Sequence, residues 1–128
     1  KAINLREGKD IAIVACGTMV YYAKKAAELL SEKGIEASVI DMHTIKPIDK
    51  EAIDAELSKQ LLVTVEEASI VGGLGSAVAE YIAPKKQKPA QLMLGIKDTF
   101  PHAGTYQYLL ESCGLTAEQI AADIEAAL

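Results

Sequence analysis

Four short apolar runs most restrict the fold of this chain. Polar segments with helical spacing separate them, and none of the runs alternates cleanly between apolar and polar residues. Strands that are covered on both faces have this composition, because neither face meets water. The runs therefore predict buried parallel strands over residues 11–16, 37–41, 61–65 and 91–96.

Helix signals occupy the segments between these runs. Apolar residues recur at helical spacing after residues that cap helix N-termini, and glycine or proline follows where a helix would end. The expected N-caps are Thr18, Asp49 and Thr116, the last with Gln119 at capping-box spacing, and the expected ends are Gly34, Pro84 and Gly114. Helices are thus predicted after Thr18, after Asp49, over 75–83, over 106–113 and after Thr116.

Alternation of strand and helix predicts right-handed parallel crossovers and an α/β fold. We expect one domain over residues 1–128, built as a three-layer α/β/α sandwich. Residues 2–7 are expected to add a short antiparallel edge strand, which would make the sheet mixed. A chain of 128 residues needs no disulfide or metal to stabilise a core of this size.

Charge and composition exclude several classes of partner. The formal net charge is −5, whereas nucleic acids and anionic membranes attract clustered basic charge. No apolar run approaches the roughly 20 residues that span a bilayer. Cys16 and Cys113 have no metal-ligand spacing, and without a secretory signal we expect both to stay reduced in the cytoplasm.

The glycine run Gly72-Gly73-Leu74-Gly75 is not interpreted as a nucleotide site. It does not follow directly on its strand, Val78 occupies the third glycine position, and no acidic residue stands about 20 positions on to bind a ribose. The glycines are expected instead to let the loop turn and the next helix start close to a neighbour. A receiver-type phosphorylation pocket is also excluded, because the first buried strand ends without an acidic pair.

Three polar residues follow the predicted strands and should gather at one edge of the sheet. They are His43, Glu66 and His102. Their spacing does not require a metal or catalytic site, so we assign no catalytic, cofactor-binding or metal-binding residue. Two roles remain open for Glu66, which are capping a helix and contacting another domain. We expect this edge to face another domain or subunit, with Ile70, Val71 and Leu74 as apolar anchors.

Longer motifs, in a fixed order along nearly the whole chain, resemble the C-terminal domain of transketolase-type thiamine diphosphate enzymes. The most specific are MHTIKPID over 42–49 and EEASIVGGLGSAVAE over 66–80, and GIKDTF over 95–100 and HAGTY over 102–106 follow. The resemblance implies a five-stranded mixed sheet of four parallel strands and one antiparallel strand. It also implies a part in two-carbon ketol transfer between sugar phosphates.

In this family, thiamine diphosphate and Mg²⁺ are held by the two preceding domains. This chain lacks the Gly-Asp-Gly signature, and Asn4 is its only asparagine. We therefore expect it to bind no cofactor itself, to be inactive alone, and to support a homodimer or heterotetramer with its thiamine diphosphate-binding domains or N-terminal subunit.

Two alternatives remain open: the domain belongs to another enzyme of the thiamine diphosphate type, or it has a function of a different class. The same domain closes the β chains of 2-oxoacid dehydrogenases and the deoxyxylulose-phosphate synthases. The alternative from another class is a free-standing regulatory module that binds a small ligand at the Glu66 and His102 edge.

Overall fold

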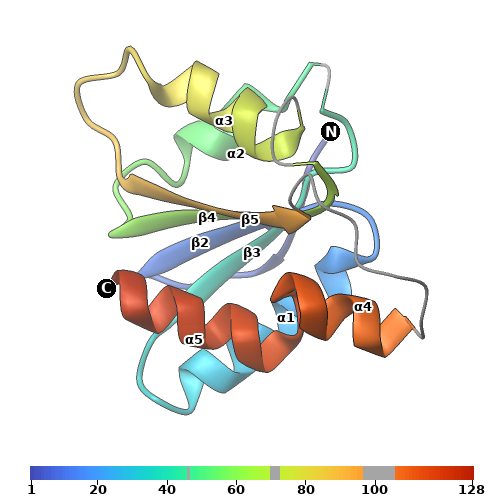
Figure 1. Ribbon diagram of the computed structural model, residues 1–128. Coiled ribbons are helices and arrows are strands. Elements are labelled where there is room, and N and C mark those ends of the chain that lie inside the picture. Colours follow the sequence, from blue (N-terminus) through green and yellow to red (C-terminus); the bar gives the residue numbers. More distant parts are fainter. Residues whose placement is uncertain (46, 70–72, 97–105) are drawn as a thin grey trace.

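The computed structural model describes the chain except for residues 46, 70–72 and 97–105. Five strands form one sheet (Figure 1). They are β1 (Ile3–Arg6), β2 (Ile11–Ala15), β3 (Ala37–Asp41), β4 (Leu61–Ser69) and β5 (Ala90–Ile96). All four strands predicted from the apolar runs are therefore present, together with the expected strand at the start of the chain.

The sheet has the strand order β1-β3-β2-β4-β5. β1 runs antiparallel to β3, with Ile3 opposite Asp41, and the other three pairs of strands are parallel. This confirms the predicted mixed sheet with one antiparallel edge strand. β2 lies in the centre, which explains why its sequence IAIVA contains no polar residue.

Helices cover both faces of the sheet (Figure 1). Helices α1, α4 and α5 lie on one face, and α2 and α3 lie on the other, which confirms the three-layer α/β/α arrangement. The helices are α1 (Met19–Ser31), α2 (Lys50–Asp54), α3 (Leu74–Ile82), α4 (Tyr106–Cys113) and α5 (Ala117–Ala127). None of the helices in the described part of the chain is long and apolar enough to span a bilayer.

The central strand contributes to two separate cores. Ile11, Ile13 and Ala15 of β2 pack towards α1 and α5, whereas Ala12 and Val14 pack towards α2 and α3. All five residues of β2 have no exposed surface. The absence of polar alternation in this run therefore reflects burial on both faces.

Several predicted helix ends are confirmed. The side chain of Asp49 accepts a hydrogen bond from the backbone N–H of Ala52, and Thr116 forms a complete capping box with Gln119. Gly34 follows α1 with φ +83°, a left-handed conformation that glycine adopts without strain.

Several details differ from the expectation. Thr18 precedes α1, but its side chain makes no capping hydrogen bond. α2, which follows Asp49 as expected, has only five residues and ends at Asp54. β4 continues to Ser69 rather than stopping at residue 65, so Glu66 and Glu67 belong to the strand.

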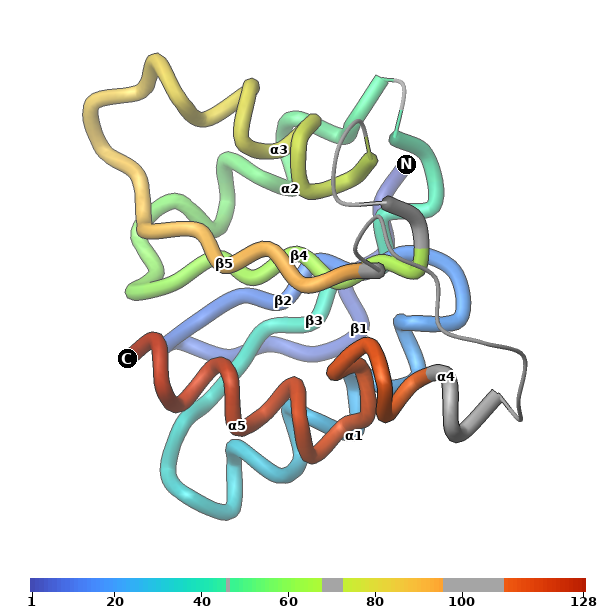
Figure 2. The backbone as a smooth tube through the Cα atoms, viewed as in Figure 1, coloured from blue at the N-terminus to red at the C-terminus, as the bar shows by residue number. Residues whose placement is uncertain are grey.

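The start of the chain lies at the same end of the molecule as the carboxyl ends of the parallel strands (Figure 2). Asp49 stabilises this position, because its Oδ2 accepts a hydrogen bond of 2.9 Å from the backbone N–H of Ala2. Any polypeptide joined ahead of residue 1 would therefore approach the protein at this end.

Candidate domain interface

The carboxyl ends of the parallel strands form an edge that we call the strand-end rim. It comprises Cys16 after β2, Asp41 and His43 at and after β3, and Glu66 and Glu67 in β4. His43 is exposed in the loop after β3. Of the other residues predicted for this edge, Ile70, Val71 and His102 lie outside the described residues.

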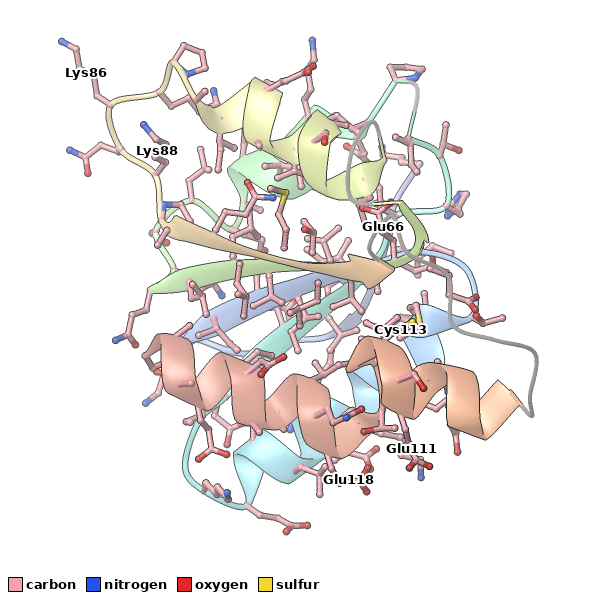
Figure 3. All side chains as sticks on the ribbon, in the orientation of Figure 1. Glu66, Lys86, Lys88, Glu111, Cys113 and Glu118 are labelled. Carbon is pink, nitrogen blue, oxygen red and sulfur yellow. The ribbon has the colours of Figure 1, made fainter. Side chains whose placement is uncertain are left out.

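Glu66 is buried and binds the start of α3. Its side chain is only 2% exposed, and its two carboxylate oxygens accept hydrogen bonds of 2.7 Å from the backbone N–H groups of Leu74 and Gly75. Figure 3 shows Glu66 beside the beginning of this helix. A carboxylate is favourable here, because the first N–H groups of a helix lack partners and carry partial positive charge.

Leu74 lies inside the protein. Its side chain has no exposed surface and packs in the core between the sheet and α3. It therefore contributes to the stability of the domain, and its side chain does not form part of the surface.

Glu67 points to the other side of the sheet. The hydroxyl of Thr18, at the start of α1, donates a hydrogen bond to the Glu67 carboxylate. α1 and α3 cover opposite faces of the sheet, so the two adjacent glutamates bind different helices. The two carboxylates are therefore directed to opposite faces of the sheet.

Cys16 lies half-buried among these carboxylates. Burial is the main effect that raises the pKa of its thiol to about 11, and the negative charges of Glu66, Asp41 and Glu67 raise it further. At neutral pH the sulfur is therefore a protonated thiol, which is a poor nucleophile and a poor metal ligand.

Gly75 is the glycine that permits a close contact at the start of α3. A Cβ atom there would lie 2.7 Å from Sδ of Met93 and 3.0 Å from Oγ1 of Thr64. From the sequence, this requirement is expected of the glycine run as a whole. Gly73 itself has φ −101°, a conformation open to other residues, so the tight packing belongs to Gly75.

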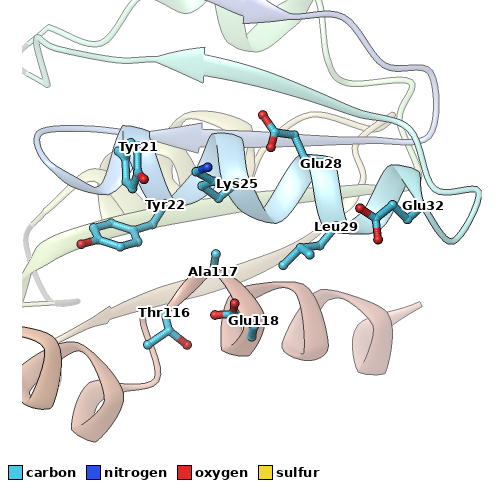
Figure 4. Close-up of a pocket in the computed structure, with 9 residues that line it drawn as sticks. All are labelled: Tyr21, Tyr22, Lys25, Glu28, Leu29, Glu32, Thr116, Ala117 and Glu118. Atoms are coloured by element: carbon cyan, nitrogen blue, oxygen red, sulfur yellow. The ribbon is translucent and has the colours of Figure 1, made fainter.

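A separate open hollow of about 470 Å³ lies between α1 and the start of α5 (Figure 4). Tyr21 is 59% exposed there, the ring of Tyr22 meets it edge-on at 5.1 Å, and Lys25 lies 5.6 Å from the centre of the Tyr21 ring. Glu28, Glu32 and Glu118 also line it. The sequence analysis did not identify this hollow, because its residues come from two helices that are distant in the chain.

Metal binding has no support in the described part of the chain. Within it, no group of three or more histidine, cysteine, aspartate or glutamate side chains is placed to hold a metal ion. Among the described residues, the strand-end rim combines the internal hydrogen bonds of Glu66 and Glu67 with the exposed side chain of His43.

Comparisons with known proteins agree with this architecture. Residues 1–120 match the family described as "Transketolase, C-terminal domain". The chain is 47% identical over 117 residues to the "Putative transketolase C-terminal section" of Methanocaldococcus jannaschii, covering 91% of this chain and 36% of that protein. It is 44% identical to a 1-deoxy-D-xylulose-5-phosphate synthase of Thermomicrobium roseum, covering 94% of this chain and 19% of that enzyme.

A solved structure described as "Split gene transketolase, inactive beta4 tetramer" superposes with a TM-score of 0.92 and 43% identity. It covers 100% of this chain, which in turn covers 42% of the solved chain. The chain thus spans well under half the length of these relatives. The family match over residues 1–120, the identity and the superposition agree, and the chain belongs to the transketolase C-terminal domain family.

Proposed function

We propose that this chain is the C-terminal section of a transketolase that transfers two-carbon units between sugar phosphates, and that it is inactive alone. The observation that carries the proposal is its 47% identity over 91% of its length to a protein named as a transketolase C-terminal section. The split-gene transketolase structure, 43% identical, supports the same assignment. A deoxyxylulose-phosphate synthase remains the second candidate parent, because one such enzyme is 44% identical.

Thiamine diphosphate and Mg²⁺ would be held by the other parts of the enzyme. Mg²⁺ requires near-octahedral oxygen ligands, usually carboxylates and diphosphate oxygens. The sequence has no Gly-Asp-Gly signature, and the described residues offer no cluster of metal-binding groups. In this proposal the chain therefore supplies no ligand to thiamine diphosphate or Mg²⁺.

The strand-end rim would face the thiamine diphosphate-binding domains. The start of the chain lies at this end of the molecule (Figure 2), so a preceding domain would be joined beside the rim. Exposed His43 supplies a polar contact, and the buried Glu66 carboxylate fixes the start of α3. In this proposal Ile70, Val71 and His102 complete the contact surface.

The complete enzyme would be a homodimer or a heterotetramer in the cytoplasm, acting in the pentose phosphate pathway. The split-gene relative supports an oligomer, since that protein is described as a tetramer. In such an enzyme the chain contributes contact surface, and the cofactor contributes the chemistry of carbon–carbon bond cleavage.

Reconstitution with the thiamine diphosphate-binding section of the same enzyme tests the proposal. Calorimetric titration of the chain alone with thiamine diphosphate and Mg²⁺ should show no saturable heat, and two-carbon transfer should appear only when both sections are mixed. His43→Asp and His102→Ala should weaken co-sedimentation of the sections, whereas Lys24→Asp on the exposed side of α1 should not. Saturable cofactor binding by the chain alone would contradict the proposal.

A further inference from the structure

The two edge strands of the sheet differ in how well they resist pairing with another chain. β1 has four residues, contains Arg6, and shifts register against β3 between Asn4 and Arg6. Short length, charge and bulges all discourage pairing at a sheet edge. β5 has seven residues, AQLMLGI, without charge or proline, and its register with β4 is unbroken from Ala90 to Gly95.

The side chains of β5 hold this edge in place on both faces of the sheet. On the α3 face, Nε2 of Gln91 donates a hydrogen bond of 3.0 Å to the carbonyl of Gly75, and Met93 covers the same glycine. On the opposite face, Leu92 and Leu94 pack against the core formed with α1 and α5. The backbone of β5 is thus preorganised, and β4 is its sole strand neighbour in the described part of the chain.

An acidic hollow of about 380 Å³ runs beside this edge. Leu94, Gly95 and Leu115 form part of its wall, and the exposed side chains of Glu111 and Asp123 supply two negative charges. No lysine or arginine is among the described residues that line it. Such a hollow favours basic side chains, since complementary charge steers partners and selects among them.

Basic residues of the chain itself lie at the other end of β5. Figure 3 shows Lys86 and Lys88 beside the start of β5, and Glu111 on α4 on the other side of the sheet. Nζ of Lys88 donates hydrogen bonds to the carbonyls of Ala83 and Lys85, so this positive charge stays near the start of the strand. A basic partner would therefore be repelled there and drawn towards the acidic hollow.

We propose that β5 binds an extended segment of a partner polypeptide whose side chains alternate between basic and apolar. When a peptide adds to a sheet in this way, hydrogen bonds between the two backbones provide affinity. Every second side chain of the peptide lies on the same face of the sheet, and its fit there provides specificity. Side chains directed to the α5 side enter the hollow beside Glu111 and Asp123. Side chains directed to the α3 side meet Met93, which is 39% exposed.

Three blocked hexapeptides test the proposal on the ¹⁵N-labelled chain. Lys-Val-Lys-Val-Lys-Val should bind saturably and shift the amide signals of β5. Glu-Val-Glu-Val-Glu-Val should bind about tenfold more weakly or not at all, because its charge is repelled. The lysine peptide with alternate backbone nitrogens methylated should lose binding, since it cannot form the ladder.

Chain variants then locate the site. Asp123→Lys, at an exposed position of α5, should weaken the lysine peptide about tenfold. Met93→Lys should do the same by placing a like charge at the strand. Ile3→Lys on β1 is the matched control at the other edge, and it should leave affinity unchanged; thermal unfolding of each variant confirms that it is folded.

Absence of saturable binding would overturn the proposal. So would equal binding of the methylated peptide, or amide shifts centred on the hollow between α1 and α5 instead of on β5. These outcomes are independent of the enzyme's reaction, because no measurement uses cofactor or turnover.

Discussion

Glu66 joins a strand to a helix through one buried carboxylate. Both of its oxygens accept backbone hydrogen bonds, from Leu74 and Gly75, and the side chain is almost fully shielded from solvent. Negative charge at a helix N-terminus contributes about 0.3–1 kcal/mol at the surface and up to about 2 kcal/mol in partly buried sites. Loss of this charge should therefore lower the stability of the whole domain.

Glu66→Gln tests this role with almost no change of shape. The NH₂ group of the glutamine side chain must then face a backbone N–H, so that two donors meet without an acceptor. An unsatisfied buried polar group of this kind costs about 1–3 kcal/mol. We expect the free energy of unfolding to fall by about 2 kcal/mol, measured from urea midpoints. Glu80→Gln, exposed on the same α3 helix, is the control and should change it by less than about 0.5 kcal/mol. Equal midpoints for the two variants would refute the capping role.

Cys16 should react slowly with alkylating reagents at neutral pH. Only the thiolate reacts, and a pKa of about 11 means that the thiolate fraction increases about tenfold per pH unit up to that value. In a Cys113→Ser background, the rate of iodoacetamide labelling should rise steadily from pH 7 to pH 10 without reaching a plateau. The labelling rate of an ordinary cysteine levels off near pH 9. If the rate for Cys16 did the same, burial and the neighbouring carboxylates would not raise its pKa.

At the scale of elements, Asp49 connects the first strand to the second helix. Its Oδ2 accepts from the backbone N–H of Ala2 at 2.9 Å, and its Oδ1 accepts from that of Ala52 at 3.2 Å. These two hydrogen bonds, that of Ala2 first, lower the pKa of the Asp49 carboxyl. The stabilisation is thus complete above the ordinary aspartate pKa, and it is lost as the pH falls through the lowered value.

Asp49→Asn should loosen the start of the chain without unfolding the sheet. We expect faster amide hydrogen exchange at Ala2 and in β1, and little change in β2, which is buried in the centre of the sheet. In the parent chain, the protection factors of the same amides, which are their intrinsic exchange rates divided by the observed rates, should fall once the pH drops below the lowered Asp49 pKa. Unchanged exchange in β1 would mean that its pairing with β3 alone holds it.

The elements that sequence reasoning located best are those with the simplest physical cause. β2 is apolar throughout, β3 is buried from Ala37 to Ile40, and Thr116 with Gln119 has the spacing that a capping box requires. The end of β4 was missed because two adjacent glutamates are typical of a loop. Glu66 stays in the strand because the N-terminus of α3 satisfies its charge, and that contact depends on tertiary structure.

The rim was predicted only in outline. The rule that parallel strands end together places His43 and Glu66 at one edge, and the structure agrees. Sequence alone did not decide which side chains face outward: His43 is exposed, whereas Leu74 is buried in the core. The role of this edge as a contact surface stays a prediction, as do the parts assigned to Ile70, Val71 and His102.

At the scale of the whole molecule, the two cores share one sheet. Ile13 belongs to the core with α1 and α5, and its neighbour Val14 belongs to the core with α2 and α3. Since adjacent residues of the same strand support both, neither core can open fully without disturbing the other. Domains of this size usually unfold in one cooperative transition.

Ile120→Ala tests this coupling. Ile120 is fully buried between α5 and the sheet, and truncation of such a residue costs about 2–5 kcal/mol. The most protected amides of α3, on the opposite face, should exchange faster by the same factor as those of α5. Ala122→Ser, exposed on α5, is the control and should leave α3 unchanged. Faster exchange confined to α5 would show that the cores unfold separately.

The last helix of the chain packs on the first. α5 and α1 face each other over the same core, although 85 of the 128 residues lie between them in sequence. The ribosome adds about 5–20 residues per second, so several seconds pass between the synthesis of α1 and the synthesis of α5. Until α5 emerges, the side of α1 that packs on it stays uncovered, so the nascent chain exposes apolar surface there.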